Sequence, residues 1–128
     1  MSPRTWIVIG AVFAALAVGS GAFGAHGLKE RLERSAKPDA KEIYETAARY
    51  QMYHALALVL VGLMSLHGSA RALDVAGVCF VVGILIFSGL LYALALGGPR
   101  ILGAIVPIGG TAFIVGWLAL AIAAWAKK

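Results

Sequence analysis

The chain has 128 residues, of which 61% are hydrophobic and 13% are charged, and its 11 Lys and Arg against 6 Asp and Glu give a net charge of +5. With a mean hydropathy of +0.88, it has too few polar residues to cover the surface of a soluble domain of this size. The composition therefore excludes an ordinary soluble protein and predicts a protein that is solvated by lipid.

Four apolar stretches are each long enough to cross a bilayer as a helix, which takes about 20 residues. They are residues 6–25, 50–66, 75–96 and 101–125. We therefore expect an all-α protein, an integral membrane bundle of four transmembrane helices. It would form a single domain over residues 1–128, with both termini on one side of the membrane.

The first predicted span ends in GSGAFGAHG, whose first six residues match the dinucleotide-binding pattern G-x-G-x-x-G. That pattern holds a pyrophosphate between a strand and a helix, and no strand is predicted here, so we expect no nucleotide. The apolar core of this span is also longer than that of a signal peptide, so we expect it to be retained.

We interpret the small residues in the predicted spans as surfaces where membrane helices approach closely. The predicted packing positions are Ala17, Gly21 and Ala25 in the first span, Gly89 and Ala93 in the third, and Gly116 in the fourth. Gly62 has no such small neighbours. We therefore expect Gly21→Leu to damage the bundle more than Gly62→Leu.

The only long polar segment, residues 26–49, separates the first two predicted spans. Its six Lys or Arg and five Asp or Glu are interspersed at helical spacing. This pattern is typical of a solvated helix face and argues against a nucleic-acid-binding arm. Pro38 suits the first turn of a helix, and no helix breaker follows before Gly62. We expect an amphipathic helical segment from about Pro38 that leads directly into the second span.

The fourth predicted span contains Pro107, Gly109 and Gly110. Proline has no N–H to donate, so we expect a helix break at these residues. Such a break either lines a ligand or ion path or is a kink that packing compensates. Thr111 is placed to satisfy a freed carbonyl. Trp117, well inside the span, needs an acceptor for its indole N–H.

The orientation can be predicted from the positively charged residues. We call the side with both termini the terminal side, and the side with residues 26–49 and 97–100 the loop side. The terminal side carries four Lys or Arg, two of which are Lys127 and Lys128, and the loop side carries seven. Although the net charges are nearly equal, the positive-inside rule counts cations and places the loop side in the cytoplasm. Both termini would then lie outside it.

Polar and ionisable side chains gather near the loop-side ends of the predicted spans. They are His26, Gln51, His54, Tyr92 and Arg100. Such groups are costly at membrane depth unless they are paired or hydrated. We therefore predict one joint polar pocket near the loop-side boundary; the alternative is five separate interfacial anchors. Because His26 and His54 fall short of the three or four ligands that a metal needs, we expect no metal and no cofactor.

Four blocks of the sequence together resemble a known family. They are GAFGAHGLKERL at 21–32, ARYQMYHALAL at 48–58, FSGLLYALALGG at 87–98 and LGAIVPIGGTAFIVGW at 102–117. In combination they resemble the YgdD/YwdK-type family of small bacterial inner-membrane proteins, whose function is unknown. The resemblance implies a four-span protein of the bacterial inner (plasma) membrane, and it brings no substrate, cofactor or reaction.

Three classes of function remain open. The favoured one is a non-enzymatic protein that binds membrane lipids or stabilises other membrane proteins, because no catalytic constellation is present in the sequence. A small transporter or channel would have to form its path as a homo-oligomer, since no acidic residue lies deep in a predicted span. A membrane enzyme acting on a lipid or quinone would use His26 or His54 as its base.

Overall fold

The computed structural model describes residues 1–68 and 70–126. Its elements are α1 (Pro3–Ala25), α2 (Lys29–Glu33), α3 (Ala40–Leu66), α4 (Arg71–Gly83), the π-helical η1 (Ile84–Ser88), α5 (Gly89–Ala95) and α6 (Ile101–Trp125). The predicted all-α class is confirmed for these residues. Lys127 and Lys128, which were counted for the terminal side, lie outside the described residues.

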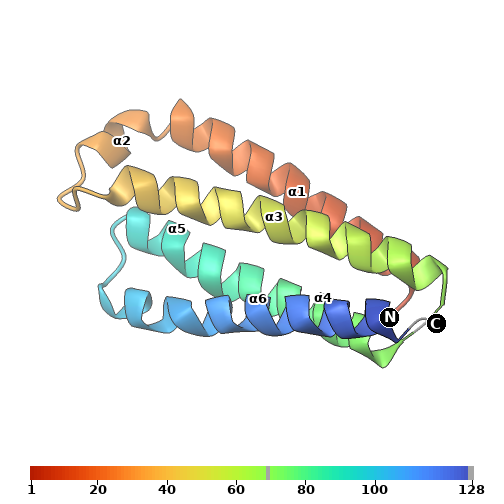
Figure 1. The fold of residues 1–128 in the computed structure, drawn as a ribbon. Coiled ribbons are helices and arrows are strands. Elements are labelled where there is room, and N and C mark those ends of the chain that lie inside the picture. The colour runs from red at the N-terminus through yellow and green to blue at the C-terminus, as the bar shows by residue number, and fades with distance from the viewer. Residues whose placement is uncertain (69, 127–128) are drawn as a thin grey trace.

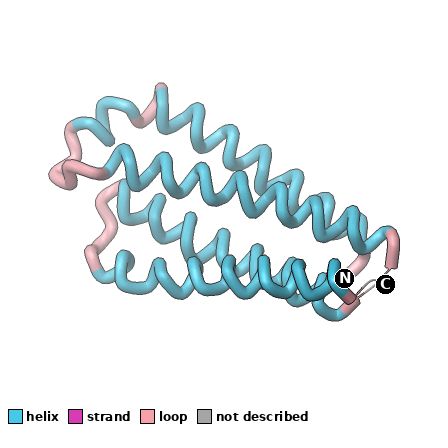
Figure 2. The backbone as a smooth tube through the Cα atoms, in the orientation of Figure 1, coloured by secondary structure: helices cyan, strands magenta, loops and turns pink. Residues whose placement is uncertain are grey.

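α1, α3, the combined α4–η1–α5 and α6 form helical rods. The rods run side by side, with the start of α1 and the end of α6 at the same end of the bundle (Figure 1). The third rod is α4, η1 and α5 together, which continue one another over Arg71–Ala95. α1 packs along α3, and α6 packs along α4 and η1. The two resulting hairpins meet where α3 contacts the third rod. Figure 2 shows α2 and the loops around it at the end opposite the start of α1, which is the loop side.

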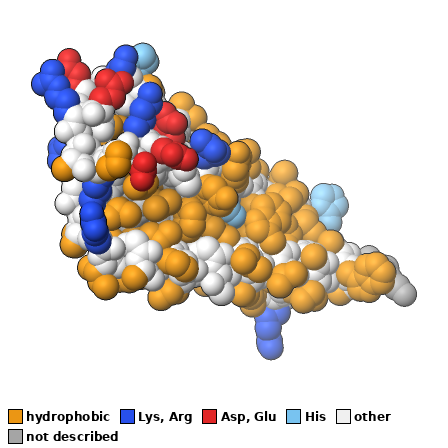
Figure 3. Space-filling view, turned by 60° about the vertical axis from the view of Figure 1, so that its left-hand side comes forward, with side chains coloured by type: hydrophobic (Ala, Val, Ile, Leu, Met, Phe, Trp, Pro, Cys, Tyr) orange, Lys and Arg blue, Asp and Glu red, His pale blue; other side chains and the backbone are white. Residues whose placement is uncertain are grey.

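Among the residues that the structure describes, three helices are long and apolar enough to cross a membrane: α1, the α4–η1–α5 rod and α6. Length and composition therefore support three spans, and the second predicted span, which lies in α3, is not confirmed. α3 begins at Ala40 and runs without interruption to Leu66, so the polar segment does lead directly into the second apolar stretch. Its first turns carry charged residues, which lower its mean hydropathy. Figure 3 shows acidic and basic side chains gathered at the loop side, while hydrophobic side chains cover most of the remaining visible face.

The contact between α1 and α3 uses a different set of small residues from the predicted one. Gly10, Ala17 and Gly24 are buried along α1, and a Cβ on Gly10 would lie 2.7 Å from the carbonyl oxygen of Ala55. These positions are seven residues apart and stay on one face, drifting only about 20° per step. The predicted positions are four residues apart, and because a helical turn takes 3.6 residues, each successive position is rotated by about 40° around the helix axis.

Several predicted packing positions consequently face outward within this chain. A Cβ on Gly21 or on Gly89 would meet nothing within 4 Å, and Ala25 and Ala93 are exposed. Among the predicted positions, Ala17 and Gly116 are buried. Gly62, where substitution by Leu is predicted to be less damaging than at Gly21, lies against α1 instead. A Cβ added at Gly62 would be 2.8 Å from the carbonyl oxygen of Pro3.

α6 continues through Pro107 without a break, which corrects the break predicted at Pro107, Gly109 and Gly110. The hydroxyl of Thr111 donates to the carbonyl oxygen of Pro107 over 3.0 Å. The irregular backbone lies in the neighbouring rod instead, at η1. Gly109 permits the close approach of these two helices, since a Cβ there would lie 2.5 Å from the backbone nitrogen of Phe87.

The loop side is held together by cationic side chains that cap the end of α5. Lys37 Nζ donates to the carbonyl oxygens of Leu94 and Gly98, over 2.9 and 2.6 Å. Arg31 donates to the carbonyl oxygen of Leu96 over 3.2 Å. The last carbonyls of a helix lack partners within the helix and carry partial negative charge. These contacts therefore connect the segment around α2 to the hairpin formed by the α4–η1–α5 rod and α6.

Candidate functional site

The five residues of the predicted polar pocket do not form one site. Gln51 and Tyr92 do come together: the Tyr92 hydroxyl donates to Gln51 Oε1 over 3.0 Å. Gln51 Nε2 also donates to the carbonyl oxygen of Phe13, over 3.0 Å. Gln51, on α3, thereby links α1 to α5. Antiparallel packing of the helices places these groups at one depth, as the sequence suggested.

His54 belongs to a separate hydrogen-bonded group. Its Nδ1 lies 2.7 Å from the carbonyl oxygen of Tyr50, and the indole N–H of Trp117 donates to its Nε2 over 3.2 Å. An indole nitrogen can only donate, so Nε2 is the acceptor and Nδ1 carries the proton that it donates to Tyr50. Both ring nitrogens of a neutral imidazole are therefore committed to partners within the protein.

His26 and Arg100 lie apart from both groups. His26 caps the end of α1 and Arg100 precedes α6, and both side chains are exposed at the loop side. His54 comes 14 residues after the start of α3 at Ala40, about 21 Å along the helix. The boundary pocket was predicted because the second apolar stretch begins at residue 50. The helix itself begins ten residues earlier, so His54 lies near its middle.

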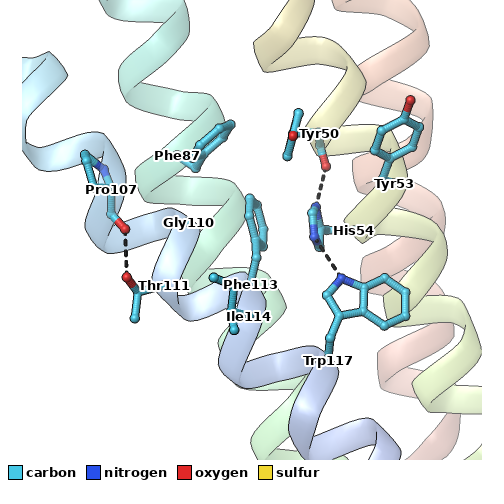
Figure 4. Close-up of a pocket in the computed structure, with 10 residues that line it drawn as sticks. All are labelled: Tyr50, Tyr53, His54, Phe87, Pro107, Gly110, Thr111, Phe113, Ile114 and Trp117. Carbon is cyan, nitrogen blue, oxygen red and sulfur yellow. Dashed lines mark hydrogen bonds between the residues drawn. The ribbon is translucent and has the colours of Figure 1, made fainter.

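A groove of about 670 Å³ lies between α3 and α6, with η1 along its base. Its lining residues are Tyr50, Tyr53, His54, Phe87, Pro107, Gly110, Thr111, Phe113, Ile114 and Trp117, shown in Figure 4. None of these described lining residues is Asp, Glu, Lys or Arg. We call this feature the aromatic groove.

The aromatic groove is built from stacked rings at mid-length of the bundle. The His54 ring stacks on Phe113 with the centroids 3.4 Å apart and the planes 7° from parallel. Phe113 is the central residue of α6. The ring of Tyr50 packs against Phe87 of η1 at 4.9 Å between centroids. The pair of His54 and Trp117 joins the walls of the groove, as the dashed line in Figure 4 shows.

The hydroxyl groups of Tyr50 and Tyr53 are the free donors of the groove. Their side chains are 38% and 52% exposed, and neither hydroxyl has a hydrogen-bond partner among the described residues. His54 and Trp117 satisfy each other, and the Thr111 proton is engaged by Pro107. The groove can therefore stack a planar ring against its aromatic faces and donate to an acceptor through a phenol.

Sequence reasoning named some residues of this groove but did not bring them together into one site. It singled out His54, the residues around Pro107, and Trp117 as an indole in need of an acceptor. It missed Phe87, Phe113 and Tyr53 as lining residues. In a uniformly apolar helix an aromatic residue carries no signal that separates a groove wall from a packed core or a lipid-facing position.

Comparisons with known proteins give one consistent result. The family described as "Protein of unknown function (DUF423)" matches residues 20–110. A "UPF0382 membrane protein" of Staphylococcus epidermidis is 50% identical over 120 residues, 94% of each chain. "UPF0382 membrane protein YwdK" of Bacillus subtilis is 43% identical over 124 residues, covering 94% of this chain and 96% of the relative. No solved structure matches the chain significantly. The resemblance seen in the sequence blocks is confirmed.

Proposed function

The chain belongs to the DUF423 family, whose relatives above are named membrane proteins, and we propose that it binds an uncharged, ring-bearing lipophilic molecule in the aromatic groove. One observation carries the proposal. At mid-length of an apolar bundle, a space of about 670 Å³ is walled by aromatic rings and lined by no charged residue among those described. Ligand sites are commonly concave, largely apolar and furnished with a few polar groups.

The chemistry of the aromatic groove favours an isoprenoid quinone as the ligand. A charged group at membrane depth is costly without a partner, and the groove offers no counterion. Aromatic faces stack on a planar ring, and the phenols of Tyr50 and Tyr53 can donate to a carbonyl oxygen. A quinone combines a planar ring, carbonyl acceptors and an apolar tail that can remain in the lipid.

We propose binding without catalysis at this site. A general base needs a free acceptor within reach of the proton that it removes. His54 Nδ1 donates to Tyr50, and Nε2 already accepts the Trp117 proton. The imidazole thus connects the groove walls, and the hydroxyl groups of Tyr50 and Tyr53 donate the hydrogen bonds to the ligand.

The groove would lie near the bilayer midplane if α3 is the second of four spans, which we also propose. α3 packs along the length of α1, and its second half presents exposed leucines to the surroundings: Leu56, Leu60, Leu63 and Leu66. The protein would be a multi-pass protein of the bacterial inner membrane. Its loop side, with seven cations, would face the cytoplasm, and both termini would lie outside.

Thermal unfolding in detergent with and without a short-chain quinone tests the proposal. A ligand that binds only the folded state raises the midpoint temperature. Gly110→Leu fills the groove, and Gly103→Leu is its matched control on the same helix, because a Cβ at either position has its nearest neighbour at 3.7 Å. We expect quinone to stabilise the wild type and Gly103→Leu, but not Gly110→Leu. No shift in the wild type, or equal shifts in all three, would contradict the proposal.

A further inference from the structure

A second concave site lies at the loop side, between the last turns of α1 and the first half of α3. Its volume is about 240 Å³, and its lining residues are Gly21, Gly24, Ala25, Leu32, Lys41, Tyr44, Glu45, Ala48 and Arg49. We call this feature the headgroup notch. Small residues of α1 form one wall, and α3 supplies three charged side chains on the other. It shares no lining residue with the aromatic groove.

The three charges of the headgroup notch are unpaired within the described part of the chain. Lys41, Glu45 and Arg49 follow one another at four-residue spacing, so they lie on one face of α3 in the order positive, negative, positive. Opposite charges at this spacing often pair, yet none of the three forms an ion pair with another described residue. All three are exposed, and their charges are therefore available to a ligand in the notch.

Arg49 lies at the level of an apolar part of α1. The Tyr44 hydroxyl donates to the carbonyl oxygen of Ser20 over 2.9 Å, which fixes the relative depth of the two helices. Arg49 is five residues beyond Tyr44 toward the centre of the bundle, about 7.5 Å along α3. A guanidinium at that depth has to extend toward the interface or find an anionic partner. Gly21 leaves room beside it, since a Cβ there meets nothing within 4 Å.

We propose that the headgroup notch binds the headgroup of a phosphatidylethanolamine lipid. Arg49 and Lys41 take the phosphate, and Glu45 accepts hydrogen bonds from the primary ammonium. A purely anionic headgroup, such as that of phosphatidylglycerol, would be repelled by Glu45. The quaternary ammonium of phosphatidylcholine has no N–H to donate. The alternation of charge along α3 therefore matches the ethanolamine headgroup best.

Native mass spectrometry of lipids retained by the protein tests this assignment. The protein would be taken from vesicles that contain equal parts of ethanolamine, choline and glycerol phospholipids. We expect the wild type to retain the ethanolamine lipid several-fold over the other two. Equal retention of all three would overturn the proposal. Soluble phosphoethanolamine at millimolar concentration should not displace the lipid, and displacement would overturn the assignment to a membrane lipid.

Two matched pairs of variants locate the site. Gly21→Leu fills the notch, whereas Gly19→Leu adds the same group to another open position of α1, outside the notch. Glu45→Gln removes the carboxylate of the notch, whereas Glu42→Gln makes the same charge change outside it. We expect loss of retention with Gly21→Leu and loss of the ethanolamine preference with Glu45→Gln. If either control behaves like its partner, the headgroup is bound elsewhere and the proposal fails.

Discussion

Trp117 donates its indole N–H to Nε2 of His54 across 3.2 Å, and this hydrogen bond connects α6 to α3. The same imidazole stacks on Phe113, also from α6. Because His54 and Trp117 line opposite walls of the aromatic groove, this hydrogen bond connects the two walls directly. The interior of this apolar bundle is thus held at mid-length by a polar contact.

Replacing Trp117 with Phe should destabilise the protein by the value of one interhelical hydrogen bond. Such bonds contribute about 0.6–1.7 kcal/mol in membrane proteins, and His54 Nε2 would be left without its donor. Unfolding in mixed detergent can measure the change. Trp125→Phe is the control, since that side chain is 84% exposed at the end of α6 and should have no effect. Equal losses from the two variants would show that the hydrogen bond does not stabilise the fold.

Gly62→Ala should destabilise the bundle, whereas Gly19→Ala should leave it unchanged. A Cβ on Gly62 would lie 2.8 Å from the carbonyl oxygen of Pro3, and a Cβ on Gly19 meets nothing within 4 Å. Overpacking of this kind costs about 1–3 kcal/mol. Thermal unfolding of both variants in one detergent provides the comparison, and a Gly62→Ala protein as stable as the wild type would refute the close α1–α3 contact.

Gln51→Leu should weaken the contact of α3 with α1 and α5. Leucine has nearly the same size but removes both the donor to Phe13 and the acceptor for Tyr92. We expect a loss of about 1–3 kcal/mol, mainly because buried polar groups lose their partners. Met52→Leu on the same helix is the control. If Gln51→Leu and Met52→Leu unfold at the same midpoint, the hydrogen bonds of Gln51 do not stabilise the fold.

The sequence predicted the helices well because long apolar runs have few alternatives to a helix in lipid. It also placed Gln51 and Tyr92 at one depth, since antiparallel helices of similar length put them there. It did not show that the charged first turns of α3 pack alongside the neighbouring helices, so His54, which was predicted near the loop-side end of the bundle, lies at the level of Phe113 in the middle of α6. The faces of α1 were misassigned for a related reason. A helix that is apolar all round has no polar stripe to show which side meets its neighbour, so Gly24 and Gly21 look alike in sequence.

Labelling of introduced cysteines tests whether α3 crosses the membrane. Single cysteines at Ser2, Ser35 and His67, in a Cys79→Ala background, would be exposed to an impermeant thiol reagent in intact cells. We expect labelling at positions 2 and 67 and none at 35 until the membrane is permeabilised. The comparison of 35 with 67 is decisive, because these residues flank α3. Labelling of both from the same side would exclude the second span.

Covalent capture of a quinone tests the central claim most directly. The protein would be reconstituted in lipid nanodiscs with a photoactivatable quinone analogue, irradiated, digested and mapped by mass spectrometry. We predict adducts within residues 50–54 of α3 and residues 107–117 of α6, the two segments that contribute most of the lining of the aromatic groove. We also predict that excess unlabelled quinone suppresses these adducts. Adducts spread over the lipid-facing residues of α1, or adducts at the groove that unlabelled quinone does not suppress, would contradict quinone binding in the aromatic groove.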